Sequence, residues 1–88
     1  MKGRVLIIDN DREHSEALSD CMKASDYEVR SIAPGPSAIE IAESFAPTAV
    51  VIDPSGDGYD PFALLRELRV QQPHTPVILT ARDSSVDR

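Results

Sequence analysis

Asp9, Asp53 and Thr80 each follow a short run of apolar residues, so an oxygen-bearing side chain stands where each run stops. If these runs are neighbouring parallel strands, the three side chains meet at one edge of a sheet. Carboxylates brought together repel one another, and a hard cation with oxygen ligands, such as Mg²⁺, relieves that repulsion. An aspartate can also act as a phosphoryl nucleophile and form an aspartyl-phosphate. The spacing therefore predicts a site for a divalent cation and a phosphoryl group.

The elements that must position these residues alternate between strands and helices. Strands are expected at residues 5–8, 27–32, 49–52 and 76–80. Helices are expected at residues 12–24, at 36–46, with Pro36 in the first turn and Pro47 after the end, and at 61–72. Short apolar runs indicate strands buried on both faces, whereas the alternating run at 27–32 indicates a half-exposed strand at the sheet edge. This order predicts an α/β fold in one domain over residues 1–88, with a doubly wound parallel sheet.

The first predicted helix carries an apolar stripe that indicates its buried face. The members of this stripe are Ala17, Leu18, Cys21 and Met22. Cys21 is therefore expected to be a small buried residue, and as the only cysteine it forms no internal disulfide. The third predicted helix begins after Asp60 as its N-cap, and Phe62, Leu65 and Leu68 are expected to face the core with Leu64 beside them.

Composition and charge exclude several classes of function. The chain has 88 residues, 41% of them hydrophobic, and a formal net charge of −6, which argues against non-specific binding to nucleic acid. It has no long apolar run and no signal peptide, so we expect a cytoplasmic protein without a membrane partner. His14 and His74 lie far apart without ligand spacing, and both are expected on the surface.

Each polar residue also has a plain structural explanation when taken alone. Asp11 suits the N-cap of the first helix, Asp9 suits a solvated strand end, and Thr80 is a common strand residue. The joint pattern favours a functional site, because three strands end on polar groups that the fold brings to the same edge.

Residues 5–11, 49–68 and 76–82 resemble the receiver domain of two-component response regulators. The resemblance covers essentially the whole chain. It implies the flavodoxin-like fold, here with strand order 2-1-3-4 and without the fifth strand and the last helices. The domain is accordingly expected to be incomplete at its C-terminal side, with an output domain beyond residue 88. The uncovered edge of the fourth strand also suggests a homodimer.

The resemblance assigns a role to each candidate residue. Asp53 is the phosphoacceptor for a histidine kinase or phosphotransfer protein, and Thr80 hydrogen-bonds the phosphoryl group as a switch. The Mg²⁺ positions are Asp9, Asn10, Asp53 and the backbone carbonyl of Ser55, with Asp11 as an additional candidate. Such a domain is a signalling module rather than an enzyme.

Two alternatives remain open at the level of sequence. Asn10 stands where the family has an acidic residue, and no fifth-strand lysine is present, which favours a non-phosphorylated pseudo-receiver that acts as a protein-interaction module. More remotely, Asp9-Asn10-Asp11 after an apolar strand is similar to the motif of haloacid dehalogenase-type phosphatases, with Asp9 as nucleophile. The identity of the phosphorylated aspartate discriminates between these readings.

Overall fold

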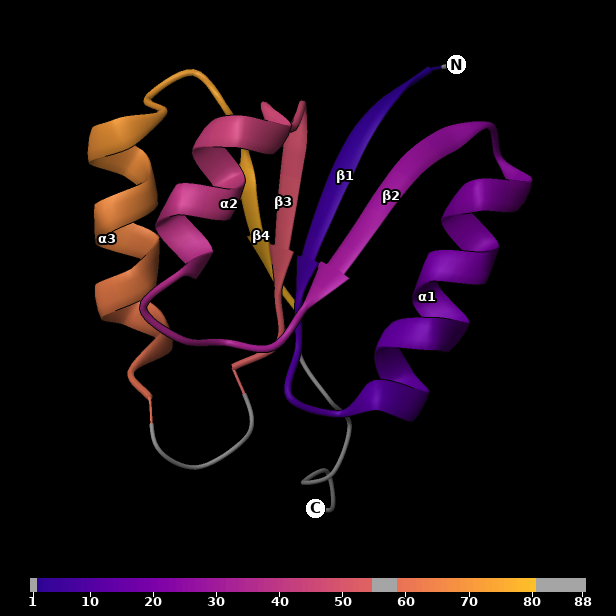
Figure 1. Ribbon diagram of the computed structural model, residues 1–88, viewed down its shortest axis with the longest axis horizontal. Coiled ribbons are helices and arrows are strands. Elements are labelled where there is room, and N and C mark those ends of the chain that lie inside the picture. The colour runs from indigo at the N-terminus through magenta and orange to yellow at the C-terminus, as the bar shows by residue number, and fades with distance from the viewer. Residues whose placement is uncertain (1, 55–58, 81–88) are drawn as a thin grey trace, which may run out of the picture.

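Strands and helices alternate along the chain, as the sequence predicts (Figure 1). The computed structural model describes residues 2–54 and 59–80. Its strands are β1 (Gly3–Ile8), β2 (Tyr27–Ile32), β3 (Ala49–Ile52) and β4 (Val77–Leu79). Its helices are α1 (Arg12–Ala24), α2 (Ala38–Phe45) and α3 (Pro61–Gln71). In the described part of the chain, none of these helices is long and apolar enough to cross a membrane.

All the strands of the sheet are parallel and lie in the order β2-β1-β3-β4, which confirms the predicted topology. The first strand, β1, occupies the centre of the sheet and pairs with β2 along its whole length. On its other side β1 pairs with β3, from Val5 opposite Ala49 to Ile8 opposite Ile52. The edge strand β4 covers residues 77–79, slightly fewer than expected.

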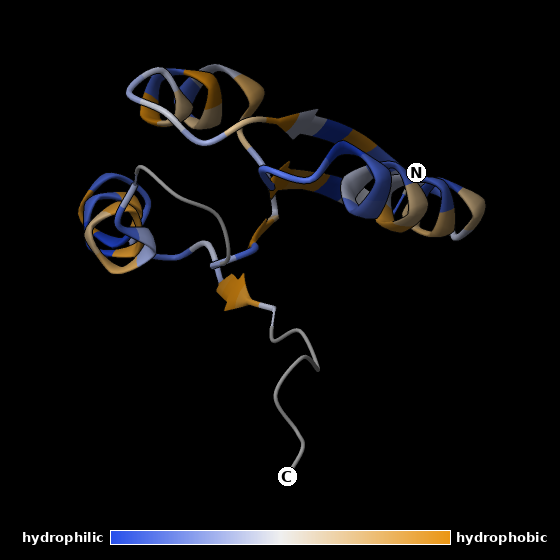
Figure 2. Ribbon diagram, turned by 90° about the horizontal axis from the view of Figure 1, so that it is seen from below, coloured by the Kyte–Doolittle hydropathy of each residue, from blue (hydrophilic) through white to orange (hydrophobic). Residues whose placement is uncertain are grey.

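The sheet separates two apolar layers of unequal size, and Figure 2 shows it edge-on with α2 and α3 on one side and α1 on the other. Alternate residues of a strand point to opposite faces. The layer under α2 and α3 contains Leu6, Ile8, Val50 and Ile52, together with Ala38, Ala42, Leu64 and Leu68. The layer under α1 contains Val5, Ile7 and Val51.

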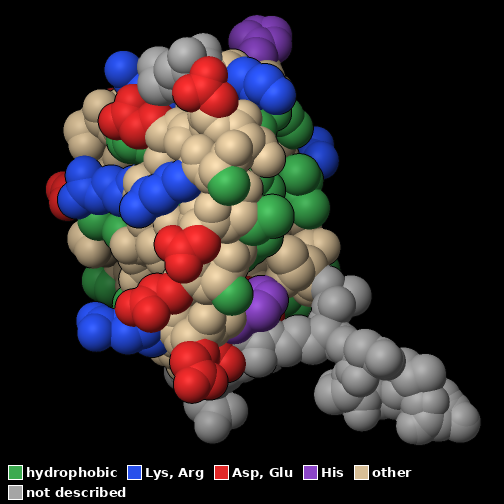
Figure 3. Space-filling view, turned by 90° about the vertical axis from the view of Figure 1, so that its right-hand side faces the viewer, with side chains coloured by type: hydrophobic (Ala, Val, Ile, Leu, Met, Phe, Trp, Pro, Cys, Tyr) green, Lys and Arg blue, Asp and Glu red, His purple; other side chains and the backbone are tan. Residues whose placement is uncertain are grey.

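The buried face of α1 differs from the predicted one. Ser15 and Ser19 are buried, Leu18 is half-buried, and Ala17 and Cys21 are exposed. The prediction that Cys21 is buried is therefore wrong. The buried Ser15 hydroxyl donates to the Arg12 carbonyl at 3.1 Å, so a hydrogen bond satisfies this polar group on the inner face of α1. On this side of the molecule, hydrophobic side chains form a band beside charged ones (Figure 3).

The N-cap predictions are confirmed for α1 and α3. Asp11 accepts a hydrogen bond from the backbone N–H of His14, and Asp60 accepts hydrogen bonds from the first turn of α3. The prediction that Phe62 faces the core is wrong, because 56% of this residue is exposed. Leu68 is buried as predicted, together with Leu64 one turn before it, and Leu65 is half-buried.

Arg4 and Thr48 hold the amino end of the sheet together. The Thr48 hydroxyl accepts a hydrogen bond from the Arg4 backbone N–H and donates one to the Arg4 carbonyl, both at 2.9 Å. The Arg4 guanidinium also donates to the Phe45 carbonyl at 3.1 Å. A Cβ atom on Gly3 would lie 2.6 Å from the Thr48 hydroxyl, so the close approach of these segments requires glycine there.

Candidate functional site

Backbone hydrogen bonds extend past the strand ends and fix Asp9, Asp53 and Thr80 side by side. The Asp53 N–H donates to the Ile8 carbonyl at 3.0 Å, and the Thr80 N–H donates to the Ile52 carbonyl at 2.9 Å. The Asp9 N–H continues the ladder toward β2 at 3.0 Å. The three residues predicted from the sequence therefore meet at the carboxyl end of the sheet, where open α/β folds place their ligands.

The alternation of the strands decides on which side of the sheet these side chains lie. Asp9 is two residues after Ile7, and Asp53 is two residues after Val51, so both continue the layer that α1 covers. Thr80 likewise follows Ile78, which pairs with Val51. The first turn of α1 is consequently the element that faces the acidic residues.

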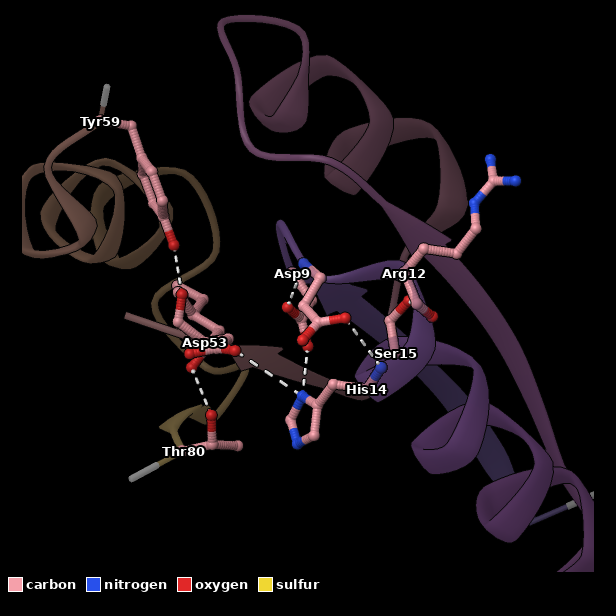
Figure 4. Close-up of polar contacts among 9 residues, drawn as sticks. Asp9, Arg12, His14, Ser15, Asp53, Tyr59 and Thr80 are labelled. Carbon is pink, nitrogen blue, oxygen red and sulfur yellow. Dashed lines mark hydrogen bonds and ion pairs between the residues drawn. The ribbon is translucent and has the colours of Figure 1, made fainter. Parts of the chain in front are cut away.

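Both carboxylates are buried, with Asp9 5% exposed and Asp53 2% exposed. One oxygen of Asp9, Oδ1, accepts a hydrogen bond from the Asp11 backbone N–H at 2.8 Å, which fixes the orientation of the carboxylate. Tyr59 lies on the other side of Asp53, and its hydroxyl donates to the Asp53 carbonyl (Figure 4). Neither the burial of Asp9 nor the presence of Tyr59 was anticipated from the sequence.

His14 is the residue of the candidate site that the sequence did not indicate, and it is half-buried rather than fully on the surface. Its Nδ1 atom lies 2.5 Å from Asp9 Oδ2 and 3.6 Å from Asp53 Oδ2, as Figure 4 shows. A helical side chain leans toward the N-terminus of its helix, so a histidine three residues after the N-cap reaches over the strand ends. The signal available in the sequence was this position in the helix, combined with the alternation that turns Asp9 and Asp53 toward α1. His74, in contrast, is exposed as predicted.

The electrostatic character of the site is visible at Tyr59. Burial first, and then the negative charges of Asp53 and Asp9, raise the pKa of the Tyr59 hydroxyl above its usual 10.0. The phenol therefore stays protonated as a hydrogen-bond donor in a region of negative potential. A cation would be favoured in the same place.

The donor set fits a divalent cation. Among the described residues, Asp9, His14 and Asp53 bring ligand atoms to within 4.8 Å of one another. Asn10 is exposed next to Asp9, and Asp11 uses its side chain to cap α1. The roles of Asn10 and Asp11 as ligands stay predictions.

Ser55 and Thr80 are the two remaining residues of the predicted site. Ser55, whose backbone carbonyl was predicted to complete the metal site, lies outside the described residues. Thr80 is half-exposed, and its hydroxyl donates to the Ile52 carbonyl at 3.4 Å. Figure 4 places Thr80 on the opposite side of Asp53 from Tyr59, so these two hydroxyls flank the buried aspartate.

Residues 5–88 of the chain match the protein family described as the response regulator receiver domain. The chain is 34% identical over 89 residues to the response regulator MprA of Mycolicibacterium vanbaalenii. It is 32% identical over 88 residues to the response regulator protein FleR of Pseudomonas aeruginosa. Each alignment covers 100% of this chain, but only 38% of MprA and 19% of FleR. The chain thus spans less than two fifths of the length of either relative.

Solved structures show the same fold. A putative response regulator from Chloroflexus aurantiacus has a TM-score of 0.84 at 24% identity and covers 98% of this chain and 72% of its own. The chemotaxis response regulator CheY4 of Vibrio cholerae has a TM-score of 0.84 at 21% identity, over 97% of this chain and 72% of its own. These similarities establish the flavodoxin-like fold, and the match over residues 5–88 establishes the family. The chain belongs to the response regulator receiver domains.

Proposed function

We propose that this chain is a phosphoaccepting receiver of a phosphorelay, in which Asp53 takes a phosphoryl group from a histidine kinase or phosphotransfer protein. The observation that carries the proposal is the position of Asp53, 2% exposed and held in register between Asp9 and Thr80. A carboxylate is costly to bury unless a partner or a reaction requires it there. Membership of the receiver family supports a signalling role in the cytoplasm rather than an enzyme with a diffusible product.

In the proposed step, a carboxylate oxygen of Asp53 attacks the phosphorus atom of a phosphohistidine. A P–O bond to Asp53 forms while the P–N bond breaks, and the departing imidazole keeps the electron pair. The Thr80 hydroxyl exchanges its bond to the Ile52 carbonyl, now at 3.4 Å, for one to a phosphoryl oxygen. A divalent cation, when bound by Asp9, Asn10, Asp53 and the Ser55 carbonyl, supplies charge neutralisation.

Phosphate incorporation from acetyl phosphate, measured by intact mass with and without a divalent cation, tests this proposal. The chain is expected to gain the mass of one phosphoryl group, and Asp53→Ala is expected to gain none. Asp20→Ala is the matched control, because Asp20 is an exposed aspartate on the outer face of α1. It should incorporate phosphate like the parent chain.

The same measurement identifies the outcomes that contradict the proposal. Label retained in Asp53→Ala and lost in Asp9→Ala would return the nucleophile to Asp9, as in the phosphatase alternative. That alternative has no support from the family match, which is to receiver domains. No incorporation by the folded chain would leave either a pseudo-receiver or a receiver that needs segments beyond residue 88, and the same assay on a longer chain separates the two.

One observation favours the pseudo-receiver as the second candidate. The His14 imidazole lies 2.5 Å from Asp9, where it can act as an internal partner for the carboxylate. Together with the uncharged amide of Asn10, this contact occupies a carboxylate oxygen that would otherwise be available to an external cation. In that case the domain would signal by binding a protein partner, and Asp53→Ala would leave the binding unchanged.

We further propose that the chain works with other protein segments. The relatives are much longer, since the aligned part is 38% of MprA and 19% of FleR, which supports an output domain beyond residue 88. The β4 edge, where Ile78 is 52% exposed, supports self-association. Sedimentation of the chain should show a concentration-dependent dimer that Ile78→Glu abolishes, and a concentration-independent monomer would overturn this part of the proposal.

A further inference from the structure

His14 gives the site a nitrogen ligand in addition to its carboxylates. Its Nδ1 atom is 2.5 Å from Asp9 Oδ2 and 3.6 Å from Asp53 Oδ2, and the ligand atoms of the three residues lie within 4.8 Å of one another. The histidine backbone is fixed by the Asp11 cap, whose Oδ1 accepts the His14 N–H at 3.2 Å. The ring is therefore presented to the carboxylates by the first turn of a helix.

The chemistry of this donor set differs from that of an all-oxygen site. Mg²⁺ binds oxygen ligands almost exclusively and keeps several waters, whereas imidazole suits Zn²⁺, Ni²⁺ and related ions. Divalent first-row ions also bind mixed nitrogen and oxygen sites more tightly toward the end of the row. Asn10, which follows Asp9, is an uncharged amide and not a carboxylate that would favour Mg²⁺. The His14 imidazole and the uncharged Asn10 amide therefore both favour a late first-row cation over Mg²⁺.

The distances are compatible with coordination by one ion. Metal–ligand bonds of about 2.0–2.2 Å in a tetrahedral site place neighbouring ligand atoms about 3.3–3.6 Å apart. The 3.6 Å separation of His14 from Asp53 already has this size, and the 2.5 Å separation from Asp9 must widen. The His14 side chain is 37% exposed and has room to move, while the buried carboxylates stay in place.

The hydrogen bond to Asp9 supports the site from outside. Asp9 Oδ1 accepts the Asp11 backbone N–H at 2.8 Å, so that Oδ2 faces His14. Outer hydrogen bonds of this kind orient ligating carboxylates and strengthen metal binding. Three protein ligands also leave coordination positions open, as in sites where water or substrate completes the sphere.

We propose that Asp9, His14 and Asp53 form a mixed nitrogen–oxygen site that binds a late first-row divalent cation, of the Co²⁺, Ni²⁺ and Zn²⁺ class, in preference to Mg²⁺. The inference deepens the proposed function by naming the cation of the same site. Its test measures binding, so it does not depend on the transfer of a phosphoryl group.

Calorimetric titration of the chain with Zn²⁺ and with Mg²⁺ is the experiment. His14→Leu is expected to weaken Zn²⁺ binding at least about tenfold and to change Mg²⁺ binding by less than about threefold. His74→Leu is the matched control, because His74 is the exposed histidine of the chain and should leave both affinities unchanged. With Co²⁺, the parent chain should show visible absorption bands that change in His14→Leu and persist in His74→Leu.

Equal Zn²⁺ affinity in the parent chain and His14→Leu would overturn the inference, and so would tighter binding in His14→Leu, which would make His14 a competitor of the cation. His14→Gln provides a second variant of similar size, and circular dichroism verifies that both variants are folded. Histidine-dependent Zn²⁺ binding without phosphate incorporation would retain this inference and reject the proposed function. Phosphate incorporation together with Zn²⁺ binding that does not depend on His14 would retain the proposed function and reject this inference.

Discussion

At the amino end of the sheet, Arg4 and Thr48 satisfy each other through reciprocal hydrogen bonds of 2.9 Å. At the carboxyl end, Asp9 and Asp53 bring two carboxylates together below 6% exposure, with His14 between them. The Arg4 and Thr48 groups at the amino end satisfy their hydrogen bonds within the fold. At the second end, the negative charges of Asp53 and Asp9 help to raise the pKa of Tyr59, which marks a region of negative potential suited to bind a cation.

The two ends of the sheet show that the hydrogen bonds of a threonine distinguish a structural position from a candidate site position. Both ends contain a threonine whose hydroxyl touches the backbone, Thr48 to Arg4 and Thr80 to Ile52. The Thr48 hydroxyl uses its donor and its acceptor capacity within the fold, whereas Thr80 makes one long bond beside a buried aspartate. The same residue type therefore completes its hydrogen bonds within the fold at one end and lies beside a buried aspartate at the other.

The largest expected effect comes from making the same substitution at both ends. Thr80→Val should slow phosphate incorporation by about 10- to 100-fold, because it removes one hydrogen bond to a charged group. Thr48→Val should leave incorporation unchanged and lower the free energy of unfolding by about 1 kcal/mol. Rates by intact mass and urea denaturation of both variants check the pair. Equal rates in the two variants would break the comparison.

Gly3→Ala tests how tightly the amino end is packed. The new Cβ would lie 2.6 Å from the Thr48 hydroxyl, so we expect a loss of about 2 kcal/mol in the free energy of unfolding. In a Thr48→Ala background the obstacle is gone, and the remaining Cβ of residue 48 is at an ordinary 3.6 Å. Gly3→Ala should then cost less than about 0.5 kcal/mol. An equal loss in both backgrounds would show that Thr48 is not the cause.

Asp53→Asn should change stability in the opposite direction. Removing one of two neighbouring buried carboxylates relieves repulsion, and we expect the free energy of unfolding to rise by about 1 kcal/mol. Asp20→Asn, on the exposed face of α1, should change it by less than about 0.5 kcal/mol. A decrease in Asp53→Asn would mean that the favourable contacts of the Asp53 carboxylate, such as the one with His14, outweigh the repulsion from Asp9.

The smallest effect is expected at Tyr59, whose pKa is raised by burial and by the charges of Asp53 and Asp9. The unfolded chain releases this proton at a lower pH than the folded chain does. The free energy of unfolding should therefore decrease as the pH rises from about 10 through the folded pKa.

A near-ultraviolet absorbance titration of Tyr27→Phe, in which Tyr59 is the remaining tyrosine, measures this pKa. Adding Asp53→Asn should move the midpoint down, because one of the negative charges is removed. An unchanged midpoint would show that burial alone raises the pKa of Tyr59. The raised pKa would then give no evidence of a negative potential at the site.

The sequence predicts where the site residues lie on the backbone, because the end of each strand is marked by neighbouring residues in the sequence. Asp9 and Asp53 each follow a strand whose apolar residues are buried on both faces, and parallel pairing then brings the two residues together. The N-caps Asp11 and Asp60 are local in the same sense, since each serves the helix that follows it. Topology and caps could be predicted for this reason.

The missed features depend on contacts between elements. His14 becomes a site residue only because the strand alternation turns two aspartates toward α1. Leu18 and Met22 pack against the sheet as predicted, but α1 is rotated so that the small Ser15 and Ser19 share their face and Cys21 does not, and helical spacing alone does not specify this rotation. Phe62 is exposed for a similar reason, because Leu64 and Leu68 already fill the contact of α3 with the sheet.

The central place of β1 has a consequence for the order of events during synthesis. β1 is made first, and β2 follows as its first partner, but its other partner β3 emerges only after α2. Until then one backbone edge of β1 is unpaired, and its residues Leu6 and Ile8 lack Val50 and Ile52 as neighbours. Unpaired strand edges in nascent chains invite aggregation. The growing chain is therefore most prone to aggregate after β1 and β2 have been synthesised and before β3 has emerged to pair with β1.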